Sequence, residues 1–185
     1  TPIAHTVMMN VIALCKGARR WQVAQSERRW ASGPTDDVEG RRMGIVGLGA
    51  IGSEVARLAP HFGIEVIGLR RTPTGRESCN TLPIDRLGEL LPTLDILVLA
   101  APLTDETRGI IGAGELALMK PGAHLINVGR GDLVDETALI ERLAHGHLGG
   151  AALDVFTVEP LPAESPLWDM PNVIVTPHSA GTTPL

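Results

Sequence analysis

Six short apolar runs recur between residues 43 and 176, and their spacing constrains the fold more than any other feature of the chain. Most of them are continuously apolar and rich in β-branched residues, as in parallel strands that are covered on both faces. They span residues 43–47, 64–69, 95–101, 124–129, 151–156 and 172–176, and helical patterns lie between them at about 50–62, 84–91, 112–118 and 135–144. This alternation predicts an α/β fold with a doubly wound parallel sheet.

The first 33 residues follow a different pattern. Apolar side chains recur with helical spacing from Ile3 to Ala18, the helical region extends to about residue 30, and Gly33-Pro34 then breaks it. Because the apolar stripe covers more than one face, we expect one helix that buries a second face in a two-fold dimer. We therefore divide the chain into a connecting and dimerisation helix (1–33) and an α/β domain (34–185).

Composition excludes several classes of partner. The formal net charge of −5 removes most of the electrostatic case for binding nucleic acid or an anionic membrane. The longest apolar stretch, from Val7 to Cys15, is far shorter than the roughly 20 residues that cross a bilayer. Two cysteines cannot form a disulfide framework, which favours a reducing, cytoplasmic compartment. We predict no metal site, since His145 and His147 have no third ligand nearby.

The first apolar run leads into a G-x-G-x-x-G motif that follows a predicted strand and opens a predicted helix. In this motif Gly47 would allow a tight turn, Gly49 would let the backbone approach a pyrophosphate, and Gly52 would let the helix pack closely on the strand. The N–H groups at the helix start, around Ala50 and Ile51, would then bind the phosphates. In this context the motif predicts a dinucleotide-binding domain.

The second run ends in Leu69 followed by Arg70, Arg71 and Thr72. An acidic residue near this position usually holds the ribose 2′-hydroxyl of NAD, and that acid is absent here. Two arginines and a threonine offer donors for a 2′-phosphate instead, which favours NADP(H), with NAD(H) as the other possibility. The competing interpretation is a pair of solvated surface arginines.

Polar or titratable residues also follow the later runs. In an open parallel sheet, ligands bind beyond the carboxyl ends of the strands, so these residues are candidates for a common site. Taken singly, each has a plain structural role as a surface charge, a cap or a loop residue. Their joint placement on one sheet edge favours a functional site. The residues concerned are Arg130, Asp154, Glu159 and His178, together with the segment Ala101-Pro102-Leu103-Thr104 that follows the third run.

Five segments carry a resemblance to a known family. They read GIVGLGAIG, APLTDETRGIIG, MKPGAHLINVGRGDLVDETALIERL, GAALDVFTVEPLPAESPLW and PNVIVTPHSAG. The chain resembles the Rossmann-like NAD(P)-binding domain of the D-isomer-specific 2-hydroxyacid dehydrogenases and is most similar to the glyoxylate and hydroxypyruvate reductase branch. This resemblance implies an oxidoreductase that transfers a hydride between NADP(H) and a small 2-oxo or 2-hydroxy acid.

The resemblance also implies roles for individual residues. Arg130 would bind the carboxylate and carbonyl of the substrate, His178 would be the acid/base, and Glu159 would be its partner. A cation and a proton donor beside the carbonyl both suit the negative charge that hydride delivery builds there. On the cofactor side Asp154 would contact the nicotinamide amide, and further cofactor-binding positions are Thr107, Val128, Ala180 and Gly181.

Two alternatives stay open at this point. The C-terminal-binding corepressors share this fold and these motifs, so the chain could be a dinucleotide-sensing interaction protein, although its acidic charge favours a metabolic enzyme. The chain could also bind nucleotide without activity, because the substrate lobe of this family is built from sequence before and after the coenzyme domain and is largely absent here. Its ends look like the cut ends of such a domain, and the sequence does not identify the 2-hydroxy acid.

Overall fold

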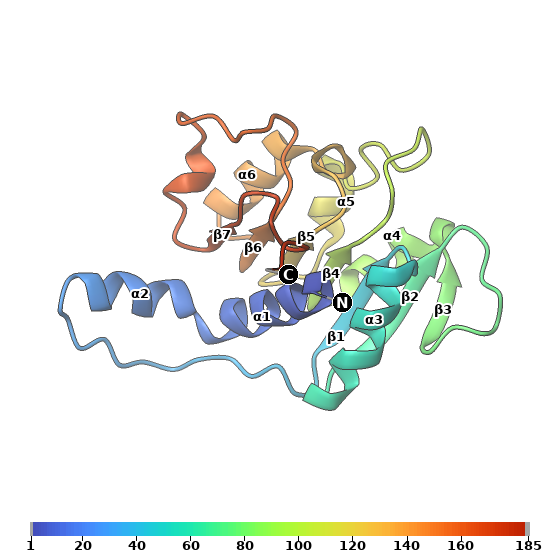
Figure 1. Cartoon of the computed structure of the whole chain (residues 1–185), viewed down its shortest axis with the longest axis horizontal. Coiled ribbons are helices and arrows are strands. Elements are labelled where there is room, and N and C mark those ends of the chain that lie inside the picture. The colour runs from blue at the N-terminus through green and yellow to red at the C-terminus, as the bar shows by residue number, and fades with distance from the viewer. Residues whose placement is uncertain (1, 184–185) are drawn as a thin grey trace.

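The computed structural model describes residues 2–183, so the predicted ends at residues 1 and 185 lie outside it. Seven strands form one sheet in the order β3-β2-β1-β4-β5-β6-β7, and every neighbouring pair is parallel (Figure 1). The first strand, β1, lies inside the sheet; β2 and β3 extend the sheet from β1 to one edge, and β4 to β7 extend it to the other. The predicted doubly wound topology is therefore confirmed. The strands are β1 Arg42–Val46, β2 Glu65–Arg70, β3 Asn80–Pro83, β4 Ile96–Leu99, β5 His124–Asn127, β6 Gly150–Leu153 and β7 Val173–Val175.

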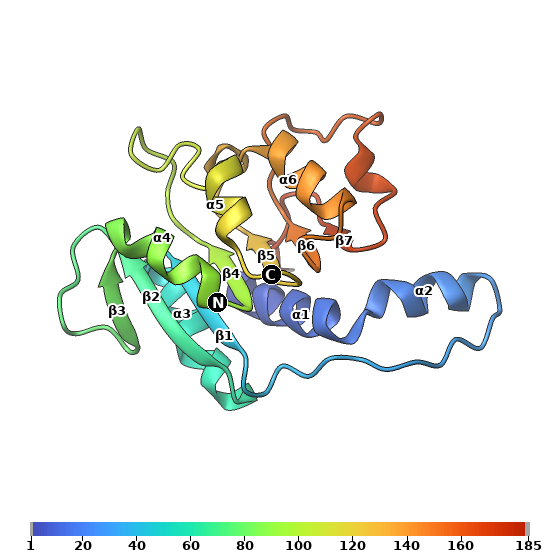
Figure 2. The ribbon, with the colours of Figure 1, turned by 180° about the vertical axis from the view of Figure 1, so that it is seen from behind.

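Helices cover both faces of this sheet (Figures 1 and 2). On one face lie α1 (Pro2–Lys16) and α3 (Ala50–Leu58), and on the other α4 (Leu87–Leu90), α5 (Ala113–Leu118) and α6 (Glu136–Ala144). Short 3₁₀ turns extend or connect them at Ala59–Phe62, Ile84–Arg86, Leu91–Thr93, Gly131–Leu133 and Pro166–Trp168. Among residues 2–183, no helix has the length and apolar character needed to cross a membrane.

The central strands are buried on both faces. Leu97 and Leu99 of β4 belong to the core under α4, α5 and α6, whereas Ile96 and Val98 belong to the core under α1 and α3. Successive side chains of a strand point to opposite faces, so one continuous apolar run supplies both cores. This explains why the runs lack polar alternation.

Strand β3 is not predicted by the pattern of apolar runs. Its sequence, Asn-Thr-Leu-Pro, has no such run, and its residues are exposed or only partly buried. It pairs with β2 alone at the edge of the sheet, where a proline is tolerated because one side of the strand needs no ladder partner. An edge strand of this kind is set by its neighbour and leaves little signal in its own composition.

The prediction of a single N-terminal helix that extends to about residue 30 is wrong in one respect. Gly17 adopts a left-handed conformation with φ 63° and separates α1 from α2 (Ala18–Ser26). Helix α1 packs one face into the core through Ala4, Val7 and Val11, which are fully buried. Helix α2 projects from the body of the molecule, and the chain returns beside it toward β1 (Figures 1 and 2).

Candidate functional site

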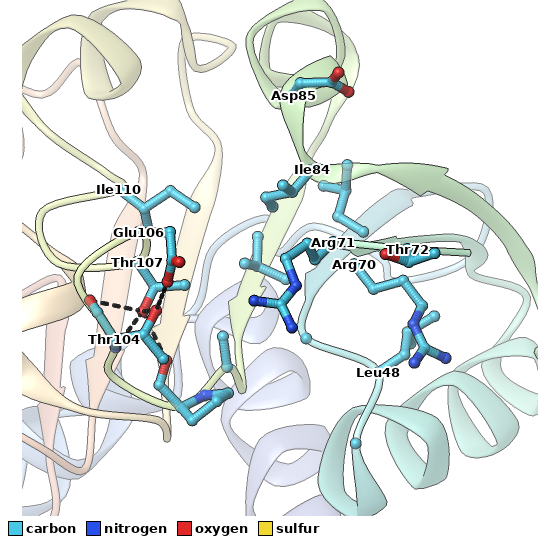
Figure 3. Close-up of a pocket in the computed structure, with 16 residues that line it drawn as sticks. Leu48, Arg70, Arg71, Thr72, Ile84, Asp85, Thr104, Glu106, Thr107 and Ile110 are labelled. Carbon is cyan, nitrogen blue, oxygen red and sulfur yellow. Dashed lines mark hydrogen bonds between the residues drawn. The ribbon is translucent and has the colours of Figure 1, made fainter. Parts of the chain in front are cut away.

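A cavity of about 530 Å³ lies at the carboxyl ends of β1, β2 and β4 (Figure 3). Eight of the residues predicted to bind the cofactor line it: Gly47, Gly49, Arg70, Arg71, Thr72, Ala101, Pro102 and Thr107. Figure 3 shows the two arginines and Thr72 on one wall and Thr104, Glu106 and Thr107 on the wall opposite. The sheet edge chosen from the sequence therefore carries a cavity of the size that small-molecule sites have.

The glycines of the predicted motif have three different surroundings. Gly47 adopts φ 94°, and a Cβ there would stand 2.6 Å from the backbone of Ala101. A Cβ on Gly52 would stand 2.0 Å from the carbonyl oxygen of Gly47, so this glycine lets α3 pack against the end of β1. A Cβ on Gly49 would meet nothing within 4 Å. Gly49 thus leaves open space at the cavity, which fits the close approach of a pyrophosphate to the backbone.

Helix α3 begins immediately after this turn, at Ala50, with Gly49 as its N-cap. Glycine has no side chain that could accept from the first-turn N–H groups, which have no partner within the helix either. The N–H groups around Ala50 and Ile51 therefore suit an anionic ligand. Neither residue lines the cavity itself.

The arginine wall combines two differently held side chains. Arg70 donates from Nη1 to Oε1 of Glu77 at 2.8 Å. No ion pair involves Arg71 among residues 2–183, and its guanidinium points into the cavity between the two walls (Figure 3). Arg71 also contributes, after the hydrogen bond from Thr104, to lowering the pKa of Glu106 on the far wall. The cavity therefore carries one cation that faces it directly and one that is shared with a carboxylate.

The opposite wall is a loop held by threonine hydroxyls. Thr107 Oγ1 donates to the carbonyl of Pro102 at 2.7 Å and accepts from the backbone N–H of Thr104 at 2.8 Å. Thr104 Oγ1 in turn donates to Glu106 at 2.7 Å. Thr107 lines the cavity as predicted, and its hydroxyl also fixes the loop that forms this wall.

Sequence reasoning missed several residues that line the cavity. Glu106 and Ile110 belong to the segment APLTDETRGIIG, where only the strand end, from Ala101 to Thr104, and Thr107 were selected. Ile84 and Asp85 directly follow β3, so recognising that strand would have brought them to the same sheet edge. Leu48 lies inside the glycine motif, where the glycines and the helix-start residues Ala50 and Ile51 were selected instead.

A second cavity, of about 400 Å³, contains two of the three predicted catalytic residues. Nδ1 of His178 lies 2.8 Å from Oε2 of Glu159, and Oε1 of the same carboxylate accepts from the backbone N–H of Phe156 at 3.0 Å. The hydrogen bond with His178, followed by the N–H of Phe156 and the positive charge of Arg130, lowers the pKa of Glu159. The structure thus places a histidine beside a carboxylate that stays ionised at neutral pH.

Asp154 holds the loop that carries His178. Its carboxylate, which is 3% exposed, accepts from Thr176 Oγ1 at 2.6 Å, from the N–H of Ser179 at 3.0 Å and from the N–H of Ala180 at 3.1 Å. Its carbonyl accepts from the N–H of His178 at 2.9 Å, and His178 adopts φ 50°. The predicted cofactor positions Ala180 and Gly181 lie in this same loop and line neither cavity.

Arg130 lies on an exposed turn at the end of β5. Its guanidinium donates to the carbonyl of Gly129 at 2.6 Å, and Asn127 braces the turn by donating to the carbonyl of Arg130 at 2.9 Å. Gly131 allows this turn to approach Phe156, because a Cβ there would stand 2.0 Å from the Phe156 backbone. Val128, predicted to contact the cofactor, is buried in the core under α1 and α3. The substrate and cofactor roles of these residues stay predictions.

Nothing in the described part of the chain resembles a metal centre. Residues 2–183 contain no group of three or more His, Cys, Asp or Glu side chains that could hold an ion. His145 instead contacts the carbonyl of Glu141 through Nδ1 at 2.7 Å, at the exit of α6.

Comparison with known proteins decides the family. The family model described as "D-isomer specific 2-hydroxyacid dehydrogenase, NAD binding domain" matches residues 8–180 of this chain. The chain belongs to this family. The match includes both cavities, the glycine motif and the loop of His178, so the family resemblance stated from the sequence is confirmed.

Individual members of the family are similar over almost the whole chain. Glyoxylate/hydroxypyruvate reductase B of Pectobacterium carotovorum is 42% identical over 99% of this chain and 61% of its own length. Among solved structures, a D-isomer specific 2-hydroxyacid dehydrogenase of Xanthobacter autotrophicus in complex with NADPH and MES is 40% identical, with a TM-score of 0.89 over 99% of this chain and 76% of that one. The NADPH-dependent glyoxylate/hydroxypyruvate reductase of Sinorhizobium meliloti, in complex with NADP and sulfate, is 36% identical, with a TM-score of 0.90 over 98% of this chain and 59% of that one. The chain spans about 60% of the length of curated relatives such as the Pectobacterium protein.

Proposed function

We propose that this chain is the NADP(H)-binding part of a reductase that acts on small 2-oxo acids such as glyoxylate or hydroxypyruvate, or on the corresponding 2-hydroxy acids. The observation that carries this proposal is the His178–Glu159 pair at the carboxyl edge of the same sheet that holds the 530 Å³ cavity. An acid/base pair and a dinucleotide site on one sheet edge are what carbonyl reduction requires.

NADP(H) is favoured over NAD(H) by the wall of Arg70, Arg71 and Thr72. A guanidinium pairs well with a phosphate, whereas the carboxylate that commonly holds the ribose of NAD would repel it. The Xanthobacter and Sinorhizobium relatives are described with NADPH and NADP, which supports the same preference here. The turn at Gly47 and Gly49 would hold the pyrophosphate.

The chemistry of the dyad follows from its hydrogen bonds. When bound, the cofactor supplies the hydride. Because Nδ1 of His178 is engaged by Glu159, Nε2 is the nitrogen left to donate a proton to the substrate oxygen. Arg130 would pair with the substrate carboxylate, and Asp154, whose buried carboxylate accepts from the N–H groups of Ser179 and Ala180, would keep the loop of His178 in place on the nicotinamide side of the site.

A homodimer in the cytoplasm completes the proposal. Helix α2 and the segment after it expose Trp21, Val23 and Trp30, the last with 96% of its surface accessible. Burying this apolar surface against a second copy would remove it from water. Sedimentation at micromolar concentration should give a dimer, and a monomer would exclude this assembly.

The cytoplasmic location is supported by the cysteines: the free thiols of Cys15 and Cys79 suit a reducing compartment.

The proposed function is tested by two linked measurements. Calorimetric titration of the chain with NADPH and NADH should show tighter binding of NADPH. Turnover is then measured with NADPH and glyoxylate or hydroxypyruvate in the protein that contains this chain. Binding without turnover would leave a nucleotide-binding domain, and equal affinity for both cofactors would remove the NADP(H) preference.

A further inference from the structure

The loop that follows β2 is organised around one buried carboxylate. Glu77 has a side chain that is 7% exposed, and it accepts hydrogen bonds from two loop residues as well as from the end of β2. Thr74 donates its backbone N–H at 2.8 Å and its hydroxyl at 2.7 Å, Arg76 donates its backbone N–H at 3.1 Å, and Arg70 donates from Nη1 at 2.8 Å. These contacts close residues 70–77 into a compact unit.

The same contacts keep Glu77 ionised. The N–H and hydroxyl of Thr74, and then the guanidinium of Arg70, lower the pKa of Glu77 from its ordinary value of 4.5 to about 2. The carboxylate is therefore charged at every pH at which an enzyme of this kind operates, and it is a permanent partner for Arg70.

Arg70 faces two environments. Its side chain lines the 530 Å³ cavity, whereas Glu77 does not. A guanidinium has five N–H donors in a fixed plane, and Glu77 engages Nη1 alone, so donors remain for an anion inside the cavity. The Glu77 carboxylate, which does not line the cavity, thus holds the Arg70 guanidinium through Nη1 and restricts the directions in which the remaining N–H donors of Arg70 can point.

We propose that Glu77 is a positioning residue for the 2′-phosphate of NADP(H): it orients Arg70 and the loop of residues 71–77, and thereby sets the preference over NAD(H). This inference rests on the proposed function, since it assumes that a 2′-phosphate occupies the arginine side of the cavity. Glu77 itself touches neither substrate nor cofactor.

A positioning carboxylate differs in its effects from an ordinary surface ion pair and from a carboxylate that repels the ligand. An ordinary surface pair is exposed at both partners, as are Arg86 and Glu89 at 51% and 63%, and contributes little. A carboxylate close to a bound phosphate would repel it, so its neutralisation would tighten NADPH binding. If Glu77 positions Arg70, neutralising Glu77 should instead weaken NADPH binding, because an Arg70 side chain that is no longer held must be ordered when the phosphate binds.

The experiment measures calorimetric affinities of the chain for 2′,5′-ADP and 5′-AMP, which differ by the 2′-phosphate alone. Glu77→Gln keeps the shape of the side chain and should weaken 2′,5′-ADP about three- to tenfold, with 5′-AMP unchanged. Thr74→Val, which removes one donor to Glu77, should cause a smaller loss in the same direction. Glu89→Gln, on the exposed pair, is the matched control and should change neither affinity.

A double-mutant cycle identifies the route of the effect. If Glu77 acts through Arg70, Glu77→Gln should cost less in an Arg70→Ala background than in the wild type. Additive losses, an unchanged ratio of the two affinities, or tighter binding of 2′,5′-ADP would each overturn the positioning role while leaving the NADP(H) proposal intact. A wild-type chain that binds 2′,5′-ADP and 5′-AMP equally would overturn the NADP(H) proposal instead, and with it the proposed 2′-phosphate site at Arg70.

Discussion

The two ends of the ligand-facing sheet edge are built in different ways. Around the larger cavity, the side-chain hydrogen bonds are local: Glu77 is seven residues from Arg70, and Thr107 is five from the carbonyl of Pro102. Around the dyad they are long-range, since His178 is 19 residues from Glu159 and Asp154 is 26 from Ala180. In the end proposed to bind the cofactor (the cofactor end), side chains thus hold individual turns, whereas the end proposed to be catalytic (the catalytic end) forms only when separate loops meet.

This difference separates binding from chemistry. We expect that residues at the cofactor end can be altered without moving the His178–Glu159 pair. Among residues 2–183, no hydrogen bond joins the loop of residues 71–77 to Asp154 or to the loop of residues 176–180 that Asp154 holds. Substitutions at the two ends should therefore change different quantities, the cofactor affinity at one and the turnover number at the other.

The largest effect is expected at the catalytic end. His178→Ala should lower kcat for glyoxylate reduction by at least about a hundredfold in the protein that contains this chain, because it removes the proposed proton donor. The NADPH affinity should not change, since His178 does not line the larger cavity. Steady-state kinetics and calorimetry measure the two quantities, and His145→Ala is the control histidine. A variant that retained most of its turnover would assign the acid to another residue.

Arg71 gives the sharpest test of the cofactor end. Arg71→Ala should weaken NADPH binding about ten- to a hundredfold, the loss expected for a charge-assisted hydrogen bond, with little change for NADH. Arg70→Ala should act in the same direction but less strongly, because Glu77 already compensates part of its charge. Fluorescence titration with both cofactors distinguishes the two variants. Equal losses for NADPH and NADH would show that the arginines do not read the 2′-phosphate.

Two glycine substitutions separate folding from binding at this end. Gly52→Ala forces a Cβ to within 2.0 Å of the Gly47 carbonyl, and such overpacking should lower Tm by roughly 5–10 °C. Gly49→Ala meets no atom within 4 Å and should leave Tm unchanged while weakening NADPH and NADH alike. Thermal melts and titrations of both variants test this. A stable Gly52→Ala variant would mean that α3 can shift away from β1.

The smallest expected effect is a shift in pH dependence. Glu159→Gln removes a carboxylate whose pKa is lowered by its hydrogen bond with His178, so that it is ionised beside Nδ1 of His178 at neutral pH. A negative charge beside a proton donor favours the charged form of that donor, and carbonyl reduction consumes a proton, so the fall in activity with rising pH should begin at lower pH in the variant. A kcat profile from pH 5 to pH 9 measures the shift, and Glu164→Gln in the same segment is the control. An unchanged profile would remove Glu159 from the dyad.

The cofactor end was the more predictable of the two from residues alone. Gly47, Gly49 and Gly52 were assigned three different tasks from their spacing, and their surroundings differ in the corresponding way. Arg70, Arg71 and Thr72 were placed at the cavity because they follow a strand. Strand β3 was missed, and with it Ile84 and Asp85, because an edge strand needs no apolar run of its own.

The proposed catalytic residues were predicted mainly through the family resemblance. Glu159 and His178 each look like ordinary loop residues, and no periodicity brings them together. Their pairing depends on Asp154, whose buried carboxylate aligns the loop of residues 176–180, and on the N–H of Phe156, which orients Glu159. Hydrogen bonds between distant loops leave no regular pattern in a sequence.

The amino-acid sequence by itself determined the parallel sheet, its burial on two faces and the glycine turn at the end of β1, because these follow from hydrophobic periodicity and side-chain size over a few neighbouring residues. Only the tertiary structure decided that Glu77 holds Arg70, that Asp154 supports His178, and that α2 leaves the body of the molecule at Gly17. Those features depend on which atoms come within hydrogen-bond distance, and which surfaces remain uncovered, once all seven strands have assembled.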